Sequence, residues 1–322
     1  MKNSFYILFA ILILSGISGC KKTSDEPKPT LNLEQRVFLL EMIDIMRNNS
    51  VNRFSIDWNK FKEDVLLKAG ATQDQNGIEP AIKLALTLLG DNHSSFITQG
   101  GKYVSGASEI YSANQDVIGI IPNDIGYIKV GAFNGINQEA QNFAINIQKT
   151  IKDADKENLK GVDLRGNSGC NMWPMVAGLG PILGEGLLGY FVDPLNIESA
   201  WTYKNGVVFL DTYTYTSVPE PYNLKKPSPK VAVLINASVA SSGEATAIAF
   251  KGRANTKFFG TPTFGVSTSN KNFDVLNQGT LILTTAIMAD RNKNKYGKKV
   301  IPDLQTNSSS ATNSEAIKWL SI

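Results

Sequence analysis

The sequence predicts a layered α/β core preceded by a small helical unit, and three observations support this prediction. Residues 125–130, 138–151 and 159–164 have the patterns of a strand, an amphipathic helix and a second strand. A continuous apolar run at 231–235 leads through a turn of small residues into a helix-compatible stretch. Apolar residues recur at helical spacing between residues 33 and 89. Alternating strands and helices favour a layered α/β architecture.

The composition is that of an ordinary globular protein. The 322 residues are 42% hydrophobic and 19% charged, which is unlike a disordered chain. The formal net charge is only +3 and the basic residues are dispersed among acids, so we expect no nucleic-acid partner. The chain has a single histidine and two cysteines, too few for a zinc cluster, and we expect no metal and no other cofactor.

The first segment has the features of an export signal. Lys2 precedes an apolar stretch at 5–14 that is too short to cross a bilayer, and small residues follow. Residues 17–20, Ile-Ser-Gly-Cys, resemble a bacterial lipobox. That resemblance implies removal of residues 1–19, a diacylated Cys20 that anchors the chain to a membrane, and a place in the bacterial cell envelope facing the periplasm or the cell surface. A simple secretory peptide cut nearby is the alternative.

The rest of the chain divides into three parts. Residues 20–32 are rich in Lys, Pro and Ser and suit a flexible tether. Residues 33–96 contain three helical patterns and form the predicted N-terminal helical unit, and residues 97–322 form the predicted core. The helical unit ends in a Gly-Asp-Asn-His-Ser turn around His93. A lone histidine near a helix end is more often a surface or capping residue than a catalyst.

Two turns carry residues that suit acyl-transfer chemistry. Ser241 and Ser242 stand at the start of a predicted helix, where free backbone N–H groups can hold an oxyanion. Alternatively, one of these serines is only a helix cap, paired with Glu244 in a capping box. A second turn follows the predicted strand at 159–164, and its glycines allow close approach to a ligand. Alternatively, those glycines serve only the turn's dihedral angles.

These segments resemble the S41 serine peptidases, the C-terminal processing peptidases and their tricorn-like relatives. The matching motifs are Asp163-Leu-Arg-Gly-Asn-Ser-Gly-Cys-Asn, Ser241-Ser-Gly-Glu, Gly252-Arg-Ala and Thr263-Phe-Gly. The resemblance implies a crotonase/ClpP-like layered core. It also implies a serine endopeptidase or carboxyl-terminal processing hydrolase that acts on a protein or peptide through an acyl-enzyme on Ser241. Asp163 and Arg165 are interpreted as a structural ion pair.

The sequence departs from the processing peptidases at the general base. Those enzymes place a lysine directly after the Thr-x-Gly turn, where this chain has Val266. Tricorn-like members carry a histidine base in a Leu-x-Asp-x-His-Ser segment, which residues 89–94 resemble. The resemblance therefore implies that His93 is the general base. Imidazole is chemically suited to this role, because its pKa lies near operating pH.

The remaining assignments also follow from the resemblance. Gly169 and Ser242 are the implied oxyanion donors, although Cys170 replaces the second glycine of the family's pair. Asp290 is the candidate that orients His93, and a solvated surface position is its alternative. Residues 97–124 are too few for the PDZ domain that processing peptidases insert there, so we expect none.

A non-catalytic alternative remains open. The same fold could serve a lipoprotein that binds a peptide or an apolar ligand, or a surface scaffold without a pocket. Val266 and Cys170 favour a non-catalytic protein, whereas the presence of both Ser241 and His93 favours an enzyme.

Overall fold

The structure, a computed structural model, describes residues 31–70, 78–106, 122–155 and 159–322. The predicted signal peptide, Cys20 and nearly all of the predicted tether lie outside the described residues. Within the described ranges, no helix is both long enough and apolar enough to cross a membrane.

The helical unit consists of three helices and a short hairpin. Asn32 caps the first helix by accepting the N–H of Gln35, and Pro80 occupies the first turn of the third. The apolar faces of the helices pack together and against strands of the antiparallel sheet, through Phe96, Leu281 and Leu283 among others. The elements are α1 (Leu33–Asn49), α2 (Trp58–Gly70), α3 (Glu79–Leu88), β1 (Ser95–Thr98) and β2 (Tyr103–Ser105).

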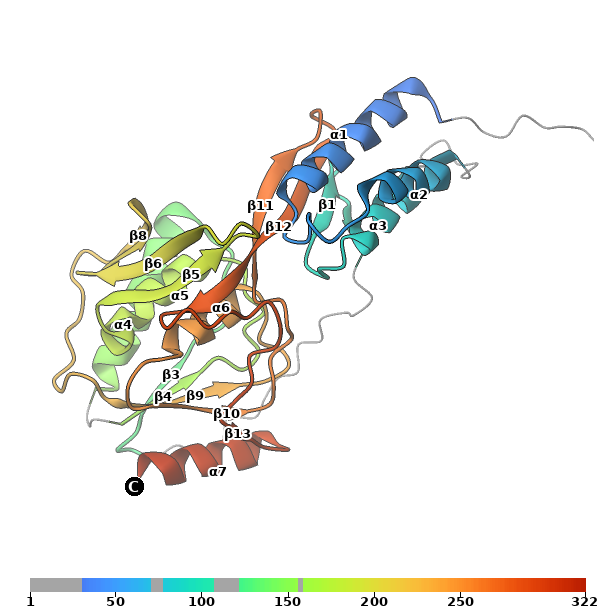
Figure 1. Ribbon diagram of the computed structural model, residues 1–322. Helices are drawn as coiled ribbons and strands as arrows, with labels where there is room; N and C mark the ends of the chain where they lie inside the picture. Colours follow the sequence, from blue (N-terminus) through green and yellow to red (C-terminus); the bar gives the residue numbers. More distant parts are fainter. Residues whose placement is uncertain (1–30, 71–77, 107–121, 156–158) are drawn as a thin grey trace, which may run out of the picture.

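A five-stranded parallel sheet forms the base of the core. Its order is β13-β10-β9-β4-β3, and every neighbouring pair is parallel. Helix α7 (Ser309–Leu320) covers one face (Figure 1). Burial on both faces explains the continuous apolar run of β9. The strands are β3 (Gly126–Lys129), β4 (Leu159–Asp163), β9 (Lys230–Ile235), β10 (Thr256–Gly260) and β13 (Leu304–Gln305).

An antiparallel sheet lies opposite. Its order is β2-β1-β12-β5-β6-β7-β8, and β11 also pairs with β12. Strand β12 pairs with β1 through residues 279–282, with β11 through residues 280–287 and with β5 through residues 287–290, so this one strand links the helical unit to the core. The remaining strands are β5 (Gly186–Val192), β6 (Glu198–Lys204), β7 (Val207–Leu210), β8 (Tyr213–Ser217), β11 (Thr268–Asp274) and β12 (Gly279–Asp290).

Helices fill the space between the two sheets (Figure 1). They are α4 (Asn137–Asp153), α5 (Met172–Leu183) and α6 (Ser242–Phe250), and every residue of α6 is buried. The main hydrophobic core joins residues of both sheets to these helices. The prediction of a layered α/β core with an N-terminal helical unit is therefore confirmed.

Candidate active site

Ser241 stands at the junction between β9 and α6. The serine turn, residues 236–241, follows the strand, and Ser241 is the residue that precedes the first turn of the helix. Its backbone has φ 51° and ψ −118°, a conformation that a residue with a side chain adopts only under strain. Strain of this kind at a strand-to-helix turn is typical of an exposed serine nucleophile.

A buried carboxylate holds the serine turn in place. Glu244 accepts the N–H of Ser241 at 3.1 Å, the N–H of Gly265 at 3.0 Å and the N–H of Val266 at 2.8 Å, as well as the hydroxyl of Thr263. Burial raises the pKa of Glu244 to about 7, although these hydrogen bonds oppose the rise. The bond to Ser241 is half of a capping box, so capping and presentation of the serine occur together.

Val266 occupies the position where the processing peptidases carry their lysine. Its side chain is buried, and its N–H is bound by Glu244. An aliphatic side chain cannot accept a proton, so any base for Ser241 comes from another element.

His93 lies in a hydrogen-bonded turn just before β1. The N–H groups of His93 and Ser94 donate to Asp91 Oδ1 at 2.9 and 2.7 Å, and Asn92 adopts a left-handed conformation with φ 55°. Ser94 Oγ donates to Asp91 Oδ2 and accepts the N–H of Thr284 on β12. The turn is therefore bound to the strand that links the helical unit to the core.

The imidazole of His93 is held by one ring contact. Its Nδ1 lies 2.7 Å from Thr268 Oγ1 at the start of β11. Burial lowers the pKa of His93 to about 4, against the opposing charge of Asp91. The ring is therefore neutral at pH 7. When Nδ1–H donates to Thr268, Nε2 carries the free lone pair that a general base requires.

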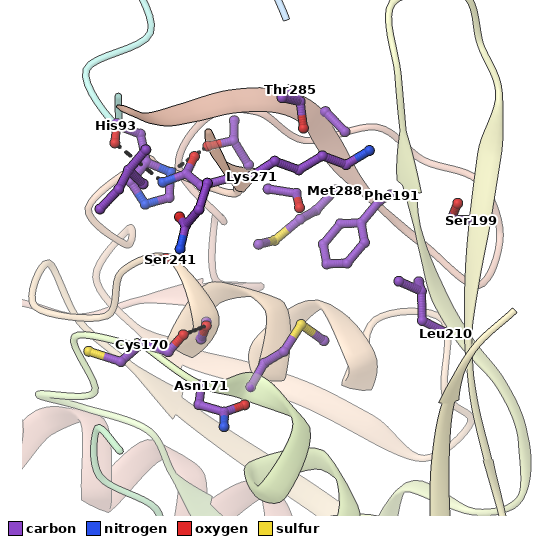
Figure 2. Close-up of a pocket in the computed structure, with 18 of the residues that line it drawn as sticks. His93, Cys170, Asn171, Phe191, Ser199, Leu210, Ser241, Lys271, Thr285 and Met288 are labelled. Atoms are coloured by element: carbon purple, nitrogen blue, oxygen red, sulfur yellow. Dashed lines mark hydrogen bonds between the residues drawn. The ribbon is translucent and has the colours of Figure 1, made fainter. Parts of the chain in front are cut away.

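His93 and Ser241 line the same cleft, and Figure 2 shows both on one side of it. No hydrogen bond joins their side chains in the described structure. Hydrogen bonds between catalytic groups are often long in unliganded enzymes and tighten when substrate binds. The cleft has a volume of about 990 Å³, enough for several residues of a peptide.

The structure does not bring Asp290 to His93. Its buried carboxylate accepts the N–H groups of Asn292 and Asn294, the side-chain amide of Asn294 and the hydroxyl of Tyr296. Asp290 is not among the residues that line the cleft. This corrects the expectation that Asp290 orients the imidazole, because its oxygens stabilise their own turn and Thr268 holds Nδ1.

The glycine-rich turn, residues 165–170, packs directly against the serine turn. A Cβ added at Gly169 would lie 2.6 Å from the carbonyl oxygen of Ala240 and 2.7 Å from the nitrogen of Ser242, so only glycine fits. The N–H of Gly169 donates to Asn167 Oδ1 at 3.0 Å. This corrects its expected role as an oxyanion donor, because its one hydrogen is already used.

Two other N–H groups remain for an oxyanion. Neither Ser242 nor Cys170 donates its backbone N–H to another group within the described ranges. Ser242 Oγ donates to the carbonyl oxygen of Cys170 at 2.8 Å, which joins the two turns at this point. The sequence analysis names Ser242 as an oxyanion donor and Cys170 only as a substitution. Asn167 Oδ1 accepts the N–H of Gly169, two residues along the turn.

The ion pair below this turn is structural. Arg165 donates to both oxygens of Asp163, at 2.9 and 2.7 Å, and both side chains are buried. Burial alone would raise the pKa of Asp163, but the hydrogen bonds from Arg165 hold it below its usual value. In the part of the chain that the structure describes, no group of three His, Cys, Asp or Glu residues could hold a metal ion.

Comparison with known proteins identifies the family. The sequence model of peptidase family S41 matches residues 124–306, which is more than half of the chain. The protein belongs to peptidase family S41. As a member of this family it is similar to the nisin-resistance protein of Lactococcus lactis subsp. lactis, with 29% identity over 276 residues, covering 83% of this chain and 80% of the relative.

Solved structures share the S41 fold. A lipoprotein from Streptococcus agalactiae has a TM-score of 0.68 at 22% identity and covers 89% of this chain and 95% of its own. The photosystem II D1 C-terminal processing protease has a TM-score of 0.58 at 16% identity and covers 90% of this chain and 100% of its own. At these identities the likeness concerns the fold.

Proposed function

We propose that this S41 protein is a serine peptidase that cleaves peptide bonds through an acyl-enzyme on Ser241, with His93 as the general base. The observation that carries the proposal is that the strained serine and the only histidine of the sequence line one cleft. The buried Val266 supports His93 as the general base, because this aliphatic side chain stands where the processing peptidases carry their lysine.

The proposed reaction proceeds in two steps. Nε2 of His93 takes the proton of Ser241 Oγ as this oxygen attacks the carbonyl carbon, and the N–H groups of Ser242 and Cys170 stabilise the oxyanion. The imidazolium then gives its proton to the leaving amine, and the ester on Ser241 remains. His93 next takes a proton from water, which attacks the ester. The imidazolium returns this proton to Ser241 Oγ as the ester bond breaks and the acid leaves.

Thr268 is proposed to replace the acid of a catalytic triad. By accepting Nδ1–H, its hydroxyl keeps the proton on Nδ1 and directs the free lone pair of Nε2 into the cleft. A hydroxyl carries no charge, so it stabilises the imidazolium less than a carboxylate would. The pKa of about 4 fits this arrangement.

The proposed location is the bacterial cell envelope, facing the periplasm or the cell surface. Two observations support it: the lipobox-like residues at Cys20, and the similarity to proteins named as a nisin-resistance protein and as a lipoprotein. We propose that a lipid on Cys20 holds the domain at a membrane, where it meets extended segments of protein or peptide substrates.

The peptidase proposal is tested by digestion. The full-length protein is incubated with a mixture of unstructured peptides, and the products are identified by mass spectrometry. We expect cleavage by the wild type, and a loss of at least about a thousandfold in Ser241→Ala and His93→Ala. Ser199→Ala removes another serine of the same cleft and serves as the control. Cleavage that persists in Ser241→Ala would contradict the proposal.

The second candidate is a peptide-binding lipoprotein without catalysis. The buried Val266 and the cysteine in the glycine-rich turn favour it. Its signature would be a wild type that binds peptides from the mixture with micromolar affinity and leaves every peptide intact.

A further inference from the structure

One end of the cleft has an aromatic wall. Its members come from α5, β5, β7, β8 and β12, and they are Trp173, Phe191, Leu210, Tyr215 and Met288. Figure 2 shows Phe191 and Leu210 across the cleft from His93, on the side away from the general base. The wall is continuous with the space above Ser241, because all of these side chains line the same cavity.

The aromatic wall is built before any ligand arrives. Trp173 stacks on Tyr215 with ring centroids 4.1 Å apart and an angle of 27° between the rings. Phe191 packs edge-on against Trp173 at 6.2 Å and against Trp201, which is fully buried behind it, at 4.7 Å. Contacts of this kind fix the rings, so a large apolar side chain would meet a preformed surface.

The charges of the cleft disfavour a basic side chain. Of the described residues that line it, Asp193 is the only carboxylate. Its oxygens already accept hydrogen bonds from Arg53 and from the N–H groups of Leu195 and Ile197. Figure 2 also shows the side chain of Lys271 extended along the cleft. A lysine or arginine of a substrate would find no free carboxylate and would approach this ammonium.

The direction of the substrate follows from the chemistry. His93 must protonate the leaving amine, so the part of the peptide on the amine side of the scissile bond lies next to His93. The acyl part then extends to the opposite side, where the aromatic wall stands.

We propose that the aromatic wall is the subsite for a large aromatic or aliphatic side chain on the acyl side of the scissile bond. The substrate class is thus peptides that carry such a residue before the cleaved bond. This inference rests on the proposed peptidase function and adds a specificity to it.

The test uses fluorogenic peptides that differ only in the residue before the cleaved bond, which is Phe, Leu, Ala or Lys. For the wild type we expect kcat/KM at least about tenfold higher with Phe or Leu than with Ala, and lowest with Lys. Tyr215→Ala and Trp173→Ala should lower kcat/KM for the Phe peptide about tenfold and change the Ala peptide about twofold or less.

The matched control is Tyr213→Ala. Tyr213 lies on the same strand as Tyr215, is 73% exposed and does not line the cleft, so its loss should leave the ratio of Phe to Ala cleavage unchanged. Tyr215 is 49% exposed, so its variant is expected to fold normally. An unchanged Phe to Ala ratio in Tyr215→Ala and Trp173→Ala overturns the subsite.

Labelling of Ser241 by a fluorophosphonate separates the two proposals. A wild type that is labelled but cleaves the four peptides equally overturns the subsite and leaves the peptidase proposal standing. A wild type that is not labelled and cleaves none of the peptides overturns the peptidase proposal, and the subsite with it.

Discussion

The site has a serine side and a histidine side, which are the elements that hold Ser241 and His93, and the two are built differently. Ser241 belongs to the main core, where Glu244 binds three backbone N–H groups and a hydroxyl across two turns. His93 belongs to the helical unit, and one contact with Thr268 holds its ring. Ser241 is therefore fixed by a buried network, whereas the orientation of His93 depends on one hydroxyl and on the strand that joins the two units.

Burial acts on both sides. It raises the pKa of Glu244 to about 7 and lowers that of His93 to about 4, so each side contains a group that burial drives toward its neutral form.

Removing the carboxyl group on the serine side should have the largest effect on stability. Glu244→Ala leaves the N–H groups of Ser241, Gly265 and Val266 buried without an acceptor. We expect the free energy of unfolding to fall by about 4 kcal/mol, measured by urea denaturation at pH 6. Glu198→Ala, which breaks the exposed pair with Lys293, should cost less than about 1 kcal/mol. Equal losses in the two variants would contradict the role of the buried network.

Opposite pH dependences should distinguish the two sides. The pKa of His93 falls from 6.5 to about 4, so its contribution to stability is present above pH 6.5 and is lost as pH falls through 4. The pKa of Glu244 rises from 4.5 to about 7, so its contribution is present below pH 4.5 and is lost as pH rises through 7. Each contribution amounts to about 3 kcal/mol.

Two variants separate these contributions. Between pH 4.5 and 6.5, the contributions of the two groups to the unfolding free energy of the wild type change with pH in opposite directions. Relative to the wild type, the unfolding free energy of His93→Gln should decrease with rising pH, and that of Glu244→Gln should increase. Denaturation curves at half-unit pH steps measure both slopes. The same slope in the wild type and both variants would contradict burial as the cause of the two pKa values.

The histidine side should be sensitive to its single contact. Thr268→Val preserves the shape of a nearly buried side chain and removes the acceptor for Nδ1–H. We expect kcat to fall by about 10- to 100-fold with little change in KM. Thr268→Ser keeps the hydroxyl and should recover most of the activity. A Thr268→Val enzyme with wild-type kcat would show that Thr268 does not position the base.

The smallest effect concerns the glycine-rich turn. Cys170 has φ 84°, a left-handed conformation that favours glycine, and its side chain is exposed. Cys170→Gly should therefore raise the free energy of unfolding by about 1 kcal/mol. Cys170→Ala keeps the strained conformation and should give no gain. Thermal unfolding of both variants measures the difference, and an equal gain from alanine would contradict strain as the cause.

The sequence was sufficient for features that depend on neighbouring residues. The apolar run of β9, the small residues after it and the start of α6 are contiguous, so the pattern predicted the strand, the serine turn and the helix correctly. The layered core followed from the same kind of local pattern. The Asp163–Arg165 pair was also accessible, because the two residues are only two positions apart.

The contacts that complete the site were less accessible. His93 meets Thr268 because β1 and β11 both pair with β12, and nothing in the local sequence encodes that register. Asp290 was misjudged because its nearby partners, Asn292 and Asn294, bind its oxygens. For both His93 and Asp290, the hydrogen-bond partner in the fold decides what the side chain can do, and the residue type alone does not.

The central claim is that His93 activates Ser241, and the rate of fluorophosphonate labelling tests it most directly. The rate is measured from pH 3.5 to 8 for the wild type, His93→Ala and Ser241→Ala. We predict that the wild-type rate falls at acid pH with a midpoint near 4, that His93→Ala labels at least about a hundredfold more slowly at pH 7, and that Ser241→Ala is not labelled. A His93→Ala protein that labels as fast as the wild type would contradict the account.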